Sequence, residues 1–426
     1  MSSTQREIQN QDTIVTPQSD EEKSPIQLSD APDGGLRAWL VTIGACCIFF
    51  CALGFSNAFG VFEEYYLRDQ LKGESADKVA WIGSLAVFLQ FLAGSIGGPL
   101  FDRHGAWVIR PATIIYVVAI MLTSVCTEYY QFILAQGILQ GAVMGFLQFP
   151  ALAAVSQFFT KKRAAALGIV ISGSSIGGVV IPIALSKMLN GTTLGFGWSV
   201  RAVGFLMTPL LSFACLAVGP RLPPRTATFF LWKAFKEAKF IGLTLALFFM
   251  LLGAFTPLFY IPTYAVTKGI DATLASYLLA IINAASTFGR ISTGVLADKF
   301  GRINIFAIGG LASAIVIFCW NLAVTTAGLV VYSIVIGFTT GMIISGASAA
   351  FTECPSDPRE LGTYIGMGMG LSSFAALIGP PVNGLFVTKF GGFTEVSIFS
   401  GVMVTVGGLI ALWTKVATPQ GLWGRV

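Results

Sequence analysis

A single arginine, Arg290, lies deep within an apolar stretch that runs from about residue 272 to residue 297. If that stretch crosses a bilayer as a helix, Arg290 lies roughly 12 Å before Asp298, well inside the hydrocarbon layer. Charge at such depth is costly and is typical of functional sites. Because a guanidinium offers a planar fork to a carboxylate, Arg290 is our main candidate for binding an anionic substrate. The alternative is an arginine that bonds helix carbonyls across an internal interface.

Other polar side chains in apolar stretches extend this candidate site. Three of them precede Arg290 by seven, four and three residues, and helical spacing places them on the same side of the helix as Arg290. Two more lie in other stretches, where a bond to a neighbouring helix is the alternative role. The predicted substrate-binding residues are Arg290, Asn283, Ser286, Thr287, Asn57 and Gln148. The chain has one histidine, and we find no His/Asp/Glu cluster in the apolar stretches and no nucleotide motif. We therefore expect no metal, no cofactor and no enzymatic activity.

A second kind of chemistry appears where an apolar stretch ends on an acid, a base and a glycine. The sequence from Gly98 to Gly105 reads GPLFDRHG, and GVLADKFG repeats the pattern 196 positions later. A carboxylate at the end of one helix can pair with basic residues or with the N-terminus of a neighbouring helix. We interpret the two copies as conformational latches, the alternative being plain turns with solvated charges. The predicted latch residues are Asp102, Arg103, Gly105, Asp298, Lys299, Gly301 and Arg302.

The composition of the chain predicts the kind of helices that position these residues. The chain has 426 residues, of which 54% are hydrophobic and only 11% charged, whereas soluble domains carry about 25% charged residues. A membrane-spanning helix needs about 20 apolar residues, and twelve such stretches are present, too long and continuous for the strands of a barrel. The predicted fold is an all-α polytopic membrane protein. Its expected spans are 38–62, 79–100, 107–126, 130–156, 164–186, 199–219, 240–265, 272–297, 303–323, 326–352, 361–387 and 394–415.

The repeat divides these spans into two halves. A second echo, 198 positions apart, joins Gly168, Ser174 and Pro182 to their counterparts in the eleventh stretch. Two six-helix halves in the same orientation suit alternating access to a site between them. The predicted organisation is a disordered cytoplasmic tail (1–36), an N-terminal half (37–219), a cytoplasmic linker (220–239), a C-terminal half (240–416) and a short cytoplasmic tail (417–426).

Basic residues orient the chain. With a cytoplasmic N-terminus, seventeen Lys and Arg fall on the cytoplasmic side and six on the other, which follows the positive-inside rule. Both termini are thus expected in the cytoplasm, and the protein is expected in the plasma membrane. The sequon at Asn190 then falls in an external loop and is a candidate for glycosylation. The basic residues are scattered among loops, so we predict no nucleic-acid partner. The expected partners are the lipid bilayer and a small molecule. The protein is expected to be monomeric.

From about Asp33 onward the sequence resembles the major facilitator superfamily, which carries the Gly-x-x-x-Asp-[Arg/Lys]-x-Gly motif after its second and eighth helices. The stretch DGGLRAW, which begins at Asp33, resembles the entry to helix one in the fungal branch of the monocarboxylate transporter family. The stretch FTKKRAAALG, from Phe159 to Gly168, is similar to that family's signature before helix five. Arg290 matches an arginine in its helix eight. The aspartate that proton-coupled members place four residues earlier is replaced by Ser286, which leaves proton coupling open.

The sequence thus predicts a transporter that moves a small organic anion, monocarboxylate-like, or a metabolite by alternating access. The alternative is an efflux transporter for a fungal secondary metabolite encoded in a biosynthetic cluster. A nutrient receptor on a transporter scaffold is less favoured, because the predicted tail of about 36 residues is short for signalling. Substrate, direction and coupling ion stay open.

Overall fold

The computed structural model describes residues 31–223, 231–419 and 421, and the helices in these ranges follow the apolar stretches of the sequence. Within the described residues, ten helical segments are long and apolar enough to cross a membrane, and two shorter apolar helices, Ile109–Thr123 and Arg302–Phe318, occupy the third and ninth predicted positions. These twelve segments correspond one for one to the predicted spans. The predicted all-α membrane fold is confirmed.

The N-terminal half supplies the first six spans. Several of these spans are built from consecutive short elements rather than one continuous α-helix. Its elements are α1 (Leu36–Asn57), α2 (Phe59–Tyr65), η1 (Tyr66–Gln70), α3 (Ala76–His104), η2 (Gly105–Trp107), α4 (Ile109–Thr123), α5 (Tyr129–Phe132), η3 (Ile133–Gln140), α6 (Gly141–Ser156), α7 (Arg163–Gly191) and α8 (Gly195–Ala217).

The C-terminal half repeats the plan. Its elements are η4 (Trp232–Lys236), α9 (Ala238–Ala254), α10 (Thr256–Thr267), α11 (Ala272–Phe300), α12 (Arg302–Phe318), η5 (Trp320–Leu322), α13 (Thr326–Phe351), η6 (Pro358–Glu360), α14 (Leu361–Phe390) and α15 (Thr394–Val416). The first span breaks at Ala58 and the seventh at Phe255, which are matching places in the two halves. Beside the second break, Thr256, Asn383 and Ser400 bond one another and are buried.

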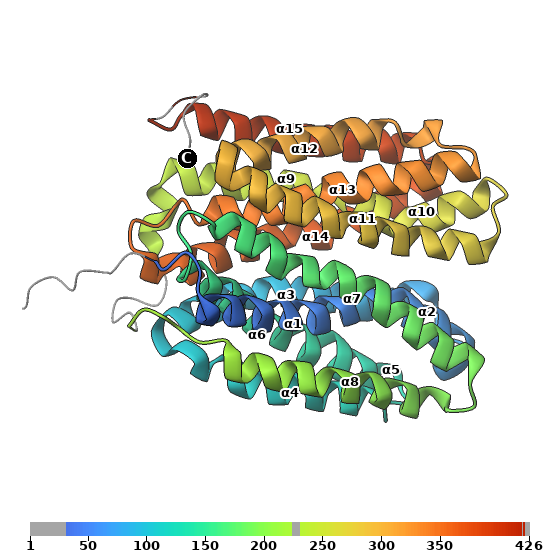
Figure 1. Ribbon diagram of the computed structural model, residues 1–426. Coiled ribbons are helices and arrows are strands. Elements are labelled where there is room, and N and C mark those ends of the chain that lie inside the picture. The colour runs from blue at the N-terminus through green and yellow to red at the C-terminus, as the bar shows by residue number, and fades with distance from the viewer. Residues whose placement is uncertain (1–30, 224–230, 420, 422–426) are drawn as a thin grey trace, which may run out of the picture. The chain divides into compact units, whose positions relative to one another are not determined.

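Figure 1 shows the two halves as two layers of roughly parallel helices, with α1 beginning and α15 ending on the same side of the bundle. We call that side the terminal face and the opposite side the distal face. The most extensive contacts between the halves join α3 to α14 and α7 to α11. The second span of each half therefore packs against the fifth span of the other half.

Glycines permit this close approach. A Cβ on Gly98 of α3 would collide with the carbonyl oxygen of Gly362 in α14, and one on Gly168 of α7 would lie 2.6 Å from the carbonyl oxygen of Arg290 in α11. Small residues let helix backbones come this close within a membrane. Gly168 belongs to the internal repeat, so the repeat marks the interface between the halves.

The predicted boundary of the N-terminal tail needs one correction. Residues 1–30 lie outside the described residues, as do 224–230 of the predicted linker and parts of the predicted C-terminal tail. Residues 31–36, which the sequence placed in a disordered tail, are described. Asp33 within them bonds the loop before α7, and α1 begins at Leu36.

Candidate functional site

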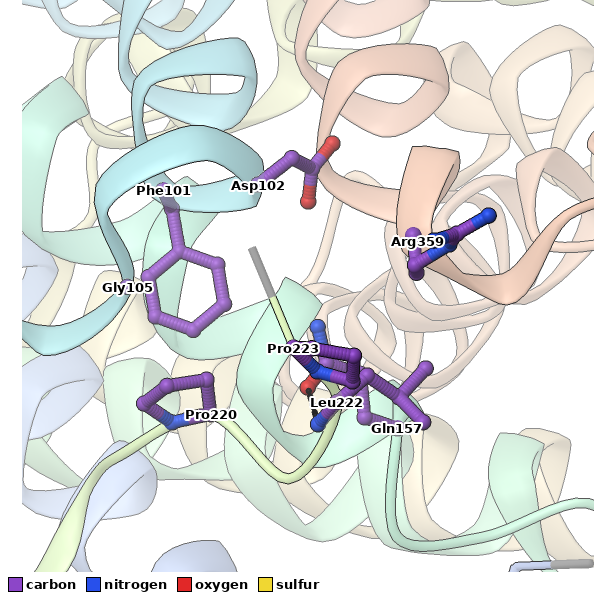
Figure 2. Close-up of a pocket in the computed structure, with 8 residues that line it drawn as sticks. All are labelled: Phe101, Asp102, Gly105, Gln157, Pro220, Leu222, Pro223 and Arg359. Carbon is purple, nitrogen blue, oxygen red and sulfur yellow. Dashed lines mark hydrogen bonds between the residues drawn. The ribbon is translucent and has the colours of Figure 1, made fainter. Parts of the chain in front are cut away.

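The first latch copy lies at the terminal end of α3, where the carboxylate of Asp102 meets the N-terminus of α14. Its oxygens accept hydrogen bonds from the backbone N–H of Gly362 at 3.2 Å and from the N–H and hydroxyl of Thr363, both at 2.7 Å. Asp102 is only 5% exposed, and its carboxylate points toward the C-terminal half in Figure 2. The positive end of the α14 dipole favours an anion at this position. One charge of the N-terminal half thus caps a helix of the C-terminal half.

The second copy makes the reciprocal contact. The carboxylate of Asp298, near the end of α11, accepts hydrogen bonds from Ala164 N at 3.0 Å and Ala165 N at 2.8 Å, both in the first turn of α7. Arg302 donates to the carboxylate of Asp298 at 3.4 Å and to the carbonyl oxygen of Thr160 at 2.7 Å, and it also bonds Glu353. The two contacts are related by the internal repeat, and both join one half to the other.

The remaining residues of the two motifs have different surroundings. Gly105 has a φ of 60° and Gly301 a φ of 98°, left-handed conformations in which glycine carries no Cβ penalty. These glycines end α3 and α11 directly after the carboxylates. Arg103 and Lys299 are exposed. The structure therefore brings the acids and Arg302 to the contacts between the halves, whereas the glycines end the helices and Arg103 and Lys299 stay on the surface.

A small cavity lies beside the first latch. It has a volume of about 10 Å³, room for about one water molecule. Its lining comes from both halves and from the start of the linker: Phe101, Asp102, Gly105, Gln157, Pro220, Leu222, Pro223 and Arg359. Pro220 packs against Gly105, and the side chain of Gln157 accepts hydrogen bonds from Arg221 N at 2.9 Å and Leu222 N at 3.2 Å. The start of the linker, residues 220–223, therefore covers the terminal end of the contact between α3 and α14 (Figure 2).

Arg290 lies at the contact between α11 and α7 and is 8% exposed. Its Nη1 donates to the carbonyl oxygen of Ile171 at 2.9 Å and to the hydroxyl of Ser174, both in α7. Its Nε is buried and has no hydrogen-bond partner among the described residues. In this conformation Arg290 holds the two halves together, which is the alternative role that the sequence left open.

Two of the predicted site residues gather beside this contact. The side chain of Asn57 donates to the carbonyl oxygen of Ser174 at 3.4 Å. A Cβ added to Gly178 would lie 2.7 Å from the amide nitrogen of Asn57 and 3.0 Å from the amide oxygen of Asn283. The two amides therefore flank Gly178, and with Arg290 they form a polar junction of α1, α7 and α11. Ser174, which the sequence noted only as part of the repeat, is central to this junction.

The other predicted residues lie elsewhere. A Cβ on Gly341 of α13 would lie 2.9 Å from the hydroxyl of Ser286, so Ser286 packs against α13. Thr287 is half-buried and donates to the carbonyl oxygen of Asn283 at 3.2 Å. The side-chain oxygen of Gln148 accepts a hydrogen bond from the side-chain nitrogen of Gln90 in α3, with 3.1 Å between the two atoms, so this contact lies within the N-terminal half. Helical spacing alone could not show which residues of α11 face α7 and which face α13, because α11 contacts neighbours on several sides.

The described residues hold no group of His, Cys, Asp and Glu arranged to bind a metal ion. Asn190 lies in the last turn of α7 and is exposed. Its amide oxygen accepts a hydrogen bond from Arg68 at 2.8 Å.

Comparison with known proteins identifies the family. The model of the Major Facilitator Superfamily matches residues 44–353 and 293–425. The aspyridones efflux protein of Emericella nidulans is 46% identical over 416 residues, which cover 98% of this chain and 84% of that protein. The agnestins efflux protein of Paecilomyces divaricatus is 39% identical over 393 residues, which cover 91% and 89%. The fujikurins efflux protein of Gibberella fujikuroi is 37% identical over 391 residues, which cover 90% and 83%.

Solved structures share the fold. The human organic anion transporter TETRAN superposes with a TM-score of 0.71 at 13% identity, covering 89% of this chain and 100% of that one. The transporter FucP, in the outward conformation, gives a TM-score of 0.69 at 14% identity, covering 88% and 98%. The three similar sequences named above are efflux proteins, so the narrower resemblance to monocarboxylate transporters stays a prediction. The family match spans nearly the whole chain, and the chain belongs to the major facilitator superfamily as a multi-pass membrane transporter of small molecules.

Proposed function

We propose that this transporter exports a fungal secondary metabolite by alternating access. The observation that carries the mechanism is the reciprocal pair of contacts in which Asp102 caps α14 and Asp298 caps α7. Three similar proteins, which this chain matches over 90% or more of its length, are named as efflux proteins for aspyridones, agnestins and fujikurins. Those names favour export of a metabolite over uptake of a small carboxylate.

The two latches set the direction in which the site opens. Both lie on the terminal face, and the excess of basic residues on that side favours a cytoplasmic orientation. The present conformation is then closed toward the cytoplasm. Export requires the latches to open so that the metabolite enters from the cytoplasm, and to close again for release at the distal face. We place the protein in the plasma membrane, where export leads out of the cell.

The contact between Arg290 and α7 is one that an acidic substrate can replace during the transport cycle. In the closed state the guanidinium bonds α7 through Ile171 and Ser174. When α7 and α11 separate, these bonds break, and a carboxylate or enolate on the substrate then accepts hydrogen bonds from the guanidinium of Arg290. Asn57 and Asn283, which flank Gly178, supply neutral hydrogen bonds beside it. The candidate site is therefore suited to an acidic metabolite that also has neutral polar groups.

Deletion of the gene in its fungal host tests the direction of transport. We expect an acidic metabolite to accumulate in the mycelium and to fall in the medium, as measured by mass spectrometry of both fractions. The wild-type gene should restore secretion, whereas Arg290→Ala should not. An unchanged distribution of every detected metabolite between mycelium and medium would contradict export, and loss of uptake from the medium would indicate an importer.

A further inference from the structure

The two stretches that resemble the monocarboxylate family are far apart in the sequence but touch in the structure. Asp33 in the first stretch accepts hydrogen bonds at its Oδ1 from three successive backbone N–H groups of the second: Thr160 at 2.6 Å, Lys161 at 2.7 Å and Lys162 at 3.3 Å. The N–H of Asp33 donates in turn to the carbonyl oxygen of Phe158 at 3.1 Å. One carboxylate thus fixes the whole turn that precedes α7.

An aromatic contact reinforces this turn. The rings of Trp39 and Phe159 meet edge to face with centroids 5.5 Å apart, so both ends of the first stretch contact the second. The chain reaches this position through an unusual backbone, in which Asp33 has a φ of 49° and Gly35 a φ of 87°. A residue other than glycine rarely adopts a positive φ, and it persists only where surrounding contacts hold it. The bonds of Asp33 to the turn are such contacts.

The turn held by Asp33 is the part of the N-terminal half that receives the second latch. Thr160 donates its N–H to Asp33 while its carbonyl oxygen accepts from Arg302 of the C-terminal half. Two and three residues after Lys162, Ala164 and Ala165 direct their N–H groups at Asp298. The same few residues therefore bond the segment before α1 on one side and the opposite half on the other.

We infer that Asp33 is a positioning residue for alternating access: it holds the N-terminus of α7 in the geometry that Asp298 and Arg302 need in order to close the terminal face. This inference rests on the proposed latch function. The first latch has a different support, because Asp102 binds α14, whose N-terminus follows η6 and its Asp357 cap. Asp33 should therefore act through one latch and not through the other.

This difference gives a test that needs no substrate. Fluorophores on unnatural amino acids at Leu216 and Val416, exposed near the terminal ends of α8 and α15, report separation of the halves by single-molecule energy transfer in liposomes. We expect Asp33→Ala to raise the open-to-closed ratio about tenfold, since it removes charge-assisted hydrogen bonds. Asp33→Asn, which keeps one acceptor oxygen, should have a smaller effect. Asp69→Ala removes the same charge from an exposed site on η1, at the distal end of the first span, and should leave the ratio unchanged.

Double variants distinguish positioning from a general structural role. If Asp33 acts through the second latch, Asp33→Ala with Asp298→Asn should shift the ratio by clearly less than the product of the single effects, because the two residues share the turn. Asp33→Ala with Asp102→Asn should give the product. Multiplicative effects in both pairs, or a lower melting temperature with an unchanged ratio, would overturn the inference. If Asp102→Asn and Asp298→Asn alone leave the ratio unchanged, the latch proposal itself fails.

Discussion

Replacing Asp102 with asparagine is the most direct perturbation of the closed state. The carboxylate accepts three hydrogen bonds at the N-terminus of α14 and is almost fully buried. Asparagine has nearly the same size and keeps one acceptor oxygen, but it loses the charge and directs an NH₂ group at backbone donors. A closed state that depends on this contact should therefore be weakened without a large change in packing.

The size of the effect follows from the contacts. Hydrogen bonds to a charged group contribute about 1.5–3 kcal/mol each, and a charge at a helix N-terminus up to about 2 kcal/mol. Since asparagine retains part of the bonding, we expect the closed state to lose roughly 2–3 kcal/mol relative to the open state. The open-to-closed ratio should then rise by about 30- to 150-fold.

Single-molecule energy transfer between fluorophores at Leu216 and Val416 measures this ratio directly. Transport should be slower than in the wild type, because the terminal face no longer closes firmly, while substrate affinity should change by no more than a few-fold. Asp298→Asn provides the comparison. Because Asp298 also accepts hydrogen bonds from two backbone N–H groups and from Arg302, we expect a comparable shift. Wild-type ratios in both variants would refute the latch.

Three further predictions concern other contacts. Arg290→Lys should restore export poorly compared with the wild type, because lysine lacks the fork; secretion by the complemented deletion strain measures this, and full rescue would argue against fork recognition. Gly98→Ala should raise the open-to-closed ratio, because its Cβ would collide with Gly362; an unchanged ratio would mean that the helix pair can spread at no cost. Burial raises the pKa of the Cys354 thiol to about 12, so maleimide should label it only slowly at pH 7 to 9, and rapid labelling seen by mass spectrometry would show that the thiol is accessible.

The sequence predicted the spans and the repeat well, because both depend on local and periodic signals. Twelve apolar stretches are long enough to be recognised individually, and the duplicated motif places Asp102 and Asp298 at matching helix ends. It could not predict which helix each acid caps. That pairing depends on how the halves pack, and packing is set by glycines such as Gly98 and Gly168, whose role appears only when the opposing backbone is present.

The candidate site was predicted less completely for a related reason. Spacing on one helix grouped Ser286 with Arg290, but a helix in the middle of a bundle touches different neighbours along adjacent faces. Ser286 packs against α13, whereas Arg290 bonds α7. Gln148 satisfies part of its hydrogen bonding with Gln90 inside its own half. A buried polar residue finds its partner in three dimensions, and the sequence supplies only the requirement that a partner exist.

The structure connects elements that the sequence showed only as separate motifs. The segment at Asp33 holds the turn before α7, this turn receives Asp298 and Arg302, and two turns further along the same helix Ile171 and Ser174 bond Arg290. The terminal latch and the candidate binding residue therefore act on one helix. If α7 moves as a unit, a substrate that displaces it from Arg290 also draws Ala164 and Ala165 away from Asp298. Occupation of the site and opening of the terminal face are then coupled through α7 alone, with no further relay required.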